Sequence, residues 1–309
     1  MKTKKHFRDF IRIFLAAVLI CLLSGCSFLK KEEPLNLPEG SYFEVYFLDV
    51  GQGDSSLIIC DGEAMLIDGG NSSQSSFIYS YLENHGITHL KYIIGTHPDA
   101  DHIGGLPGAL NYATVDVAFC SALEYDTKTF HNFVKYLDNS GVTLRIPDLM
   151  EDISLGSATG KIIGPVDSTA EGNNNSLVLR LEYGNTSFLF TGDAEYEEEK
   201  DILNNATTLK STVLKVGHHG STYSTSHKFL TEVRPGYAVI SAGKDNDYGH
   251  PHVKTLSRLK SASLKLFRTD LQGTIICNSD GNDVKFSVEK NENADVFEAT
   301  NSYVGTDEN

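Results

Sequence analysis

The chain has 309 residues, of which 40% are hydrophobic and 22% are charged, a composition that is ordinary for a folded globular protein. Its formal net charge is −15 at pH 7. Because a strongly acidic surface repels polyanions at long range, this balance argues against a protein that binds nucleic acid nonspecifically.

The N-terminus has the pattern of an export signal. Basic side chains precede an apolar stretch over residues 13–23, which is shorter than the about 18 to 20 residues of a membrane span. A Leu-Ser-Gly-Cys sequence that ends at Cys26 follows and resembles the bacterial lipobox, whose cysteine carries a lipid. We expect residues 1–26 to be a lipoprotein signal peptide and lipobox, and residues 27–41 to be a tether. The alternative is an anchor helix with an incidental cysteine.

This pattern also predicts where the protein acts. A lipid on Cys26 would hold an extracytoplasmic protein at the bacterial cell membrane. The remaining cysteines Cys60, Cys120 and Cys277 lie in apolar, strand-like stretches, so we expect buried free thiols there.

Hydrophobic periodicity predicts strands and helices in two halves of the chain. In the first half we expect strands over residues 42–50, 55–60, 64–67, 91–95, 115–119 and 142–146, and helices over residues 75–83, 103–110 and 127–137. A loop-rich region around residues 148–160 separates the halves. In the second half we expect strands over residues 161–164, 177–183, 186–191, 211–216 and 237–241, helices near residues 195–204, 226–232 and 251–259, and closing strands near residues 264–287.

Two strand-rich halves flanked by helices indicate an α/β fold, an αββα sandwich. We expect one domain over residues 42–289, which is large for a single core but within the range of α/β folds. Residues 290–309 are expected to form an acidic tail that is frayed from Asn291 onward.

Four side chains that can bind a metal fall within residues 97–102, which read His-Pro-Asp-Ala-Asp-His. Crowding two imidazoles and two carboxylates costs repulsion and desolvation unless a cation offsets it. The stretch before them, residues 90–96, reads as a buried strand, so the cluster follows the carboxyl end of a strand, where α/β proteins place their sites. A divalent metal or a pair of metals is therefore expected here. The alternative is a polar loop that opens the next helix.

Two later strands end in further metal-binding side chains. Asp193 follows the apolar stretch at residues 188–190, and His218 and His219 follow the stretch at residues 213–216. Alone, each is weak evidence, since a Gly-Asp after a strand is usually a plain turn. Together with the first cluster, they converge on one site.

These residues resemble the metallo-β-lactamase superfamily, whose signature is His-x-His-x-Asp-His, followed by another His, a bridging Asp and a last His. A closer similarity is to the soluble hydrolase domain of the ComEC DNA-uptake family, in which the second His of the signature is likewise Asp. Its other motifs occur here at residues 47–54 (Phe-Leu-Asp-Val-Gly-Gln-Gly-Asp), 68–70, 174–179, 191–195, 218–221 and 248–252. The resemblance covers about residues 42–278 and implies an αββα sandwich of the metallo-β-lactamase type, here as a stand-alone lipoprotein.

The resemblance also implies a set of metal ligands. One metal would be held by His97 and Asp99, the other by Asp101 and His102, with Asp193 bridging and His218 completing the second. The sequence does not decide between His218 and His219. The intermediate His of the superfamily is missing, because residues 171–176 offer only Glu-Gly-Asn-Asn-Asn-Ser. Oxygen-rich ligation favours Mn²⁺ more than an all-histidine site does, so we expect two divalent ions, Zn²⁺ or Mn²⁺.

The implied chemistry is hydrolysis by a hydroxide that two metals share. Asp101, His219 and His250 are the expected catalytic residues, with His219 or His250 stabilising the departing group or donating its proton. For His250 the alternative is an ordinary turn histidine. Asp49, Asp54 and Asp68 are expected to fix loops by hydrogen bonds rather than to bind metal.

Three functions remain open from the sequence. The first is an extracytoplasmic phosphodiesterase or nuclease that acts on DNA or a cell-wall polymer. The second is another hydrolase on the same scaffold, a teichoic-acid phosphocholine esterase or a lactonase-type enzyme. The third is a non-catalytic surface binding lipoprotein; no protein partner can be inferred. A basic path to the metals would favour DNA, and aromatic walls would favour choline. The candidate basic groups, which otherwise simply face water, are Lys254, Arg258, Lys260, Lys265 and Arg268.

Overall fold

The computed structural model describes residues 37–205 and 208–299. The predicted signal peptide, Cys26 and residues 27–36 of the predicted tether lie outside the described residues. Within the described ranges, no helix has the length and apolar composition that crossing a membrane requires.

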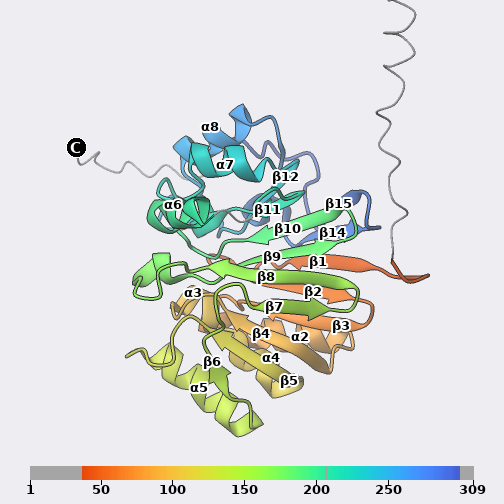
Figure 1. Ribbon diagram of the computed structural model, residues 1–309, viewed down its shortest axis with the longest axis vertical. Coiled ribbons are helices and arrows are strands. Elements are labelled where there is room, and N and C mark those ends of the chain that lie inside the picture. Colours follow the sequence, from red (N-terminus) through yellow and green to blue (C-terminus); the bar gives the residue numbers. More distant parts are fainter. Residues whose placement is uncertain (1–36, 206–207, 300–309) are drawn as a thin grey trace, which may run out of the picture. The chain divides into compact units, whose positions relative to one another are not determined.

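Two β-sheets pack face to face at the centre of the domain (Figure 1). The eight-stranded sheet has the order β15-β14-β1-β2-β3-β4-β5-β6 and the seven-stranded sheet the order β13-β12-β11-β10-β9-β8-β7. The first sheet contains β1 (Phe43–Phe47), β2 (Ser56–Cys60), β3 (Glu63–Ile67), β4 (His89–Gly95), β5 (Thr114–Cys120), β6 (Leu144–Arg145), β14 (Ile275–Ser279) and β15 (Val284–Val288). The second contains β7 (Asp152–Leu155), β8 (Ala158–Gly164), β9 (Val178–Tyr183), β10 (Thr186–Phe190), β11 (Val213–Lys215), β12 (Tyr237–Ile240) and β13 (Lys265–Arg268).

The core between the sheets is built from alternate strand positions. In β1 the first, third and fifth residues are buried, as the period-two pattern predicts. The ring centroid of Phe43 lies 4.7 Å from that of Phe188 in the other sheet, and Phe47 lies 6.2 Å from Phe190. Burial of apolar surface, worth about 25 cal/mol per Å², therefore joins the two sheets.

Helices cover the outer face of each sheet. The helices α2 (Ser75–Asn84), α4 (Leu106–Tyr112) and α5 (Lys128–Ser140) pack on the eight-stranded sheet, and α6 (Tyr196–Asn204), α7 (His227–Val233) and α8 (Val253–Ser261) pack on the seven-stranded sheet. The short helices are α3 (Ala100–Ile103), α9 (Thr269–Gln272), η1 (Ser72–Gln74), η2 (Gly172–Asn175) and η3 (Gly217–Gly220). These four layers confirm the predicted αββα sandwich.

Two expectations from the sequence were wrong. The region around residues 148–160 is not mainly loop: it forms β7 and the first part of β8, an antiparallel pair at the edge of the seven-stranded sheet. An edge strand of four residues buries only Ile153 and Leu155, which is too few apolar positions for a recognisable pattern. The stretch from Asn291 is not frayed as far as it is described, because Val296 and Phe297 pack against the core beneath the second helical layer.

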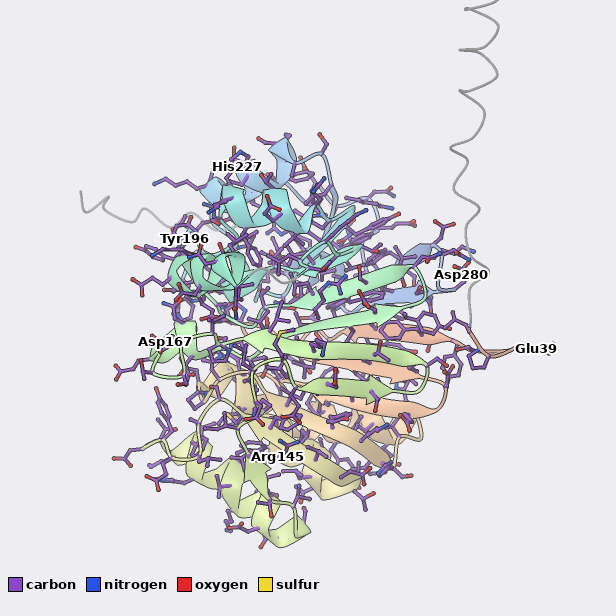
Figure 2. All side chains as sticks on the ribbon, in the orientation of Figure 1. Glu39, Arg145, Asp167, Tyr196, His227 and Asp280 are labelled. Carbon is purple, nitrogen blue, oxygen red and sulfur yellow. The ribbon has the colours of Figure 1, made fainter. Side chains whose placement is uncertain are left out.

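The strand directions bring several loops to one edge of the sandwich. The strands β3 to β6 are parallel to one another, and so are β10 to β13. Figure 2 shows Asp167 and Tyr196 at one edge of the sheets, and Glu39 and Asp280 at the opposite edge. Tyr196 begins the helix after β10, so its edge is the one where the parallel strands end. Loops at the carboxyl ends of parallel strands are where such folds carry their sites.

Candidate metal centre

The first cluster lies directly after β4, around the short helix α3. His97 and His102 are 1% and 0% exposed, so both rings are inside the protein. The chain after α3 packs closely against the chain after β3 because Gly105 has no side chain. A Cβ at this position would lie only 1.9 Å from the carbonyl oxygen of Gly69. The backbone after β3 and the backbone after α3 are therefore in direct contact.

Asp68 fixes the orientation of His102. Its Oδ2 accepts a hydrogen bond from His102 Nδ1 at 2.9 Å, and its Oδ1 accepts one from the backbone N–H of Thr96 at 2.8 Å. Because Nδ1 donates to a carboxylate, Nε2, which points into the site, is the nitrogen left to bind a metal. Asp68 thus fixes a loop, as expected, and also sets the tautomer of a candidate ligand.

Asp193, which follows β10, lies at the centre of the site. Its Oδ1 lies 3.2 Å from His102 Nε2, and its Oδ2 lies 3.4 Å from His219 Nε2. Ser176 supports it from the stretch that lacks the intermediate histidine, because Ser176 Oγ accepts a hydrogen bond from the Asp193 backbone N–H at 3.1 Å. One carboxylate therefore contacts His102 with one oxygen and His219 with the other, and a ligand atom of His97 also lies within 4.8 Å of it, so Asp193 stands between the residues expected to hold the two metals.

The two histidines after β11 lie in a strained turn. His218 and His219 both have left-handed backbone angles, with φ of 48° and 53°. Each such non-glycine residue costs about 1–3 kcal/mol, and such strain is concentrated at functional sites. His219 Nδ1 donates to the carbonyl oxygen of Ser241 at 3.1 Å, and His218 Nδ1 lies 3.1 Å from Glu195 Oε1. Both rings therefore present Nε2 to Asp193.

The geometry favours His219 over His218 as the ligand that completes the second metal. His219 is 1% exposed, and its Nε2 lies 3.3 Å from Asp101 Oδ2. The side chain of His218 is 20% exposed, and its Nε2 lies 3.7 Å from Asp193 Oδ2. The resemblance implies His218, although a sequence pattern alone cannot distinguish two adjacent histidines. A role for His218 as a ligand stays a prediction, with the weaker geometry.

Asp99 lies on the open side of the site. Its Oδ2 is 3.6 Å from His97 Nε2, and its side chain is 40% exposed. Tyr125, from the loop after β5, donates a hydrogen bond from its hydroxyl to Asp99 Oδ1 at 3.4 Å. The proposed first metal would thus have one buried imidazole and one exposed carboxylate of its own.

The buried carboxylates of the site shift the pKa values of the neighbouring histidines, as expected where negative charge awaits a cation. Burial alone would lower the pKa of His102 and His219, but nearby carboxylates, Asp193 first among them, outweigh it and raise both pKa values well above the ordinary one. Burial would raise the pKa of Asp193 and of Asp101, but the histidines outweigh it and lower both. Protons on the imidazoles therefore take the place that a divalent ion would fill, and metal binding would release them.

Unpartnered atoms test whether a metal fits. His97 Nε2, His102 Nε2, Asp193 Oδ1 and His219 Nε2 are buried and have no hydrogen-bond partner among the described residues. Such atoms are costly to leave unsatisfied. One ligand atom each from His97, His102 and Asp193 lie within 4.8 Å of one another, and so do those of Asp101, His102 and His219. The donor set of imidazoles and carboxylates fits divalent ions such as Zn²⁺ or Mn²⁺.

Comparison with known proteins agrees with this geometry. Residues 48–244 match the family model described as the metallo-beta-lactamase superfamily. The chain belongs to this superfamily. The assignment covers the first cluster, Asp193 and both histidines of the strained turn.

Two relatives confirm the predicted resemblance to the ComEC family. ComE operon protein 3 from Bacillus subtilis (strain 168) is 33% identical over 251 residues, covering 75% of this chain and 32% of the relative. Recombination protein 2 from Haemophilus influenzae is 33% identical over 245 residues, covering 76% of this chain and 29% of the relative. The chain thus spans about a third of the length of these relatives.

A solved structure agrees on the fold. The metallo-beta-lactamase fold protein YhfI from Bacillus subtilis aligns with a TM-score of 0.50 at 11% identity, covering 77% of this chain and 100% of that one. At this identity the likeness concerns the fold alone, and one fold hosts many chemistries.

His250 lies beside the two histidines of the strained turn. Its ring centroid is 5.3 Å from that of His218 and 6.0 Å from that of His219. Burial, together with the neighbouring imidazoles, lowers the pKa of His250 to about 3. The ring is therefore neutral at pH 7, which suits hydrogen bonding to a bound group better than proton donation. Its predicted catalytic role stays a prediction.

Two of the five candidate basic groups, Arg258 and Arg268, are engaged within the fold and do not line a path to the metal centre. Arg268 is 0% exposed and pairs with Asp270, the closest contact being 2.6 Å between Nη2 and Oδ2. Arg258 donates to the backbone carbonyl oxygens of Thr222 and Ser224 and so holds a loop. These two arginines stabilise the fold. Arg268 was expected either to line a path for DNA or to face water, and its complete burial fits neither expectation.

Sequence reasoning missed Lys215 and Glu195. Glu195 contacts His218, and the buried Lys215 pairs with Asp54. The signal for Lys215 was its place in the otherwise apolar strand Val-Leu-Lys-Val, where a charge has to find a buried partner. The expected free thiols are confirmed, since Cys60, Cys120 and Cys277 are buried and unpaired.

Proposed function

We propose that the protein is a metal-dependent phosphodiesterase. The observation that supports this most is the position of Asp193 among the buried imidazole nitrogens of His97, His102 and His219. When bound, two divalent ions would supply a nucleophile from water at neutral pH and neutralise charge on phosphoryl oxygens. Phosphate diesters suit such a site because they carry negative charge and lack a proton that must first be removed.

The protein's own residues would orient and surround the substrate. Asp68 and Ser241 hold the rings of His102 and His219, so that the nitrogens facing the site are already in place before any ion binds. His250, neutral at pH 7, would donate a hydrogen bond to an oxygen of the departing group. Tyr125 stands at the open side beside Asp99 and would meet the substrate first.

The rim of the site supports a second candidate, a phosphocholine esterase. Tyr125 contacts Asp99 and the ring of Tyr248 stacks on His250 at 5.7 Å, and both tyrosines are exposed. Exposed acidic residues flank them: Glu124 and Asp126 beside the first, Asp247 beside the second. Aromatic faces and carboxylates attract a quaternary ammonium group and repel a polyanion. A diester with a cationic headgroup therefore fits this rim better than a long nucleic acid does.

Metal removal tests the proposed function. We expect the chelator-treated protein to lose hydrolysis of bis-p-nitrophenyl phosphate by about a hundredfold or more and to regain it with Mn²⁺ or Zn²⁺, because the ions supply the nucleophile. Comparing p-nitrophenyl phosphorylcholine, single-stranded DNA and nitrocefin under the same conditions would rank the substrate classes. Asp101→Ala should remain inactive after metal addition, whereas Asp116→Ala, on the exposed part of β5, should behave as the unmodified protein. Hydrolysis that survives complete metal removal, or no phosphoester hydrolysis with metal restored, contradicts the proposal.

We also propose that the protein acts outside the cytoplasm, attached to the membrane by a lipid on Cys26. This proposal rests on the sequence pattern of residues 1–26 alone. We expect Cys26→Ser to release the protein from membranes or to block its maturation, because one modified thiol provides the anchor. Fractionation of cells, with mass spectrometry of the N-terminus, measures this. A processed variant that stays in the membrane fraction would rule out the lipid anchor.

A further inference from the structure

Lys215 is a buried cation that the proposed reaction does not use. It ends β11 in the seven-stranded sheet, and its side chain is 2% exposed. Its Nζ lies 2.7 Å from Asp54 Oδ2 and donates to the carbonyl oxygen of Val216 at 3.0 Å. Burying an ammonium group is costly, and an apolar side chain of similar length would fill the same space without that cost. The charge therefore calls for an explanation other than packing.

Asp54 connects this cation to the metal centre. It belongs to the loop between β1 and β2 of the other sheet, and its Oδ1 lies 3.1 Å from His219 Nδ1. Its backbone N–H donates to the carbonyl oxygen of Asp101 at 3.1 Å. One residue thus contacts two of the candidate ligands of the second metal, Asp101 and His219. The pair with Lys215 joins the two sheets directly beneath them.

The same contacts hold the strained turn. His218 and His219 have left-handed backbone angles that cost energy, so the surrounding structure has to maintain them. Lys215 Nζ binds the carbonyl oxygen of Val216, just before the turn, while Asp54 and the carbonyl oxygen of Ser241 both face His219 Nδ1. The hydrogen bond to Ser241 and the nearby Asp54 carboxylate favour the proton on Nδ1, so that Nε2 is the nitrogen left for a metal.

We propose that Lys215 is a positioning residue: through Asp54 it fixes the ring of His219 with Nε2 directed at Asp101 and Asp193. The inference rests on the proposed metal site and adds a residue that touches neither metal nor substrate. Asp54 is the contact through which Lys215 reaches the His219 ring, so the two residues should act as one unit.

Metal titrations test the proposal without any substrate. The variants are Lys215→Met, Asp54→Asn and the double variant, with Lys91→Met as the matched control, because Lys91 pairs with Glu63 on the strands β4 and β3, outside the site. The measurements are Zn²⁺ affinity by chelator competition, the absorption spectrum of the Co²⁺-loaded protein and the unfolding temperature. Lys215→Met leaves the Asp54 carboxylate buried without its cation and is the variant at risk of misfolding. The double variant removes both charges and keeps the shape of the pair.

We expect each single variant and the double variant to bind the tighter Zn²⁺ about tenfold or more weakly, since outer-shell partners of ligands have effects of this size. The double variant should be no weaker than the single ones, and its Co²⁺ spectrum should change while Lys91→Met retains the normal one. A folded double variant with unmodified affinity and spectrum would overturn the proposal, as would losses in the two single variants that simply add. An unmodified protein that binds metal but hydrolyses nothing would contradict the proposed function and leave these titrations valid.

Discussion

His219→Ala is expected to abolish hydrolysis and to weaken binding of the second metal by about a hundredfold or more, while His218→Ala loses less than about tenfold of either. The reason is geometric: His219 is buried within 3.4 Å of both Asp101 and Asp193, whereas His218 is partly exposed and 3.7 Å from Asp193. Chelator competition for Zn²⁺ and phosphodiester hydrolysis measure the two effects separately.

The pair of variants contains its own control. His218 and His219 share the same turn and the same left-handed backbone, so both alanine variants change the strain in the same way. A difference between them therefore reports the ligand and not the loop. If His218→Ala is the more damaging change, the assignment returns to the family pattern, and the buried ring of His219 has to act by orienting Asp101.

The fold was predictable because its signals are local and repeated. Alternation in β1 and the amphipathic helices specified which faces are buried, and the two-half pattern specified the sandwich. The hairpin of β7 and β8 was not predictable, because β7 pairs only with β8 and its residues Ile153 and Leu155 are buried by the core between the sheets rather than marked by a local pattern. The packing of Phe297 on the core likewise depends on contacts far away in sequence.

The metal-binding residues were predictable where they are adjacent in the sequence or directly follow a predicted strand. Crowded histidines and aspartates between residues 97 and 102 indicated a metal, and strand ends indicated Asp193 and the later histidines. The sequence could not show how the side chains are oriented or which residues they contact. Only the structure shows that Asp68 and Ser241 occupy Nδ1 of two rings, and that Lys215 finds its partner on the other sheet.

Asp99→His is expected to shift the metal preference of the first site toward Zn²⁺. Asp99 contributes an exposed carboxylate 3.6 Å from His97 Nε2, and residues 171–176 bring Ser176 rather than an imidazole to His97. With few nitrogen donors, the first metal should bind more weakly than the second, so the protein should purify with about one tight metal and gain activity when Mn²⁺ or Zn²⁺ is added.

An added imidazole favours Zn²⁺, so Asp99→His should tighten the weaker Zn²⁺ site by about tenfold or more and reduce any Mn²⁺-dependent rate. Metal titration of the metal-free protein, read together with hydrolysis at each step, measures both. Asp116→His is the matched control, since it also exchanges an exposed carboxylate for an imidazole but lies on β5, away from the metal centre. Two equally tight sites in the unmodified protein, with no response to added metal, would contradict this account. Asp99 would then orient His97 rather than bind a metal, and the exposure of its carboxylate at the edge of the site would have to serve another purpose.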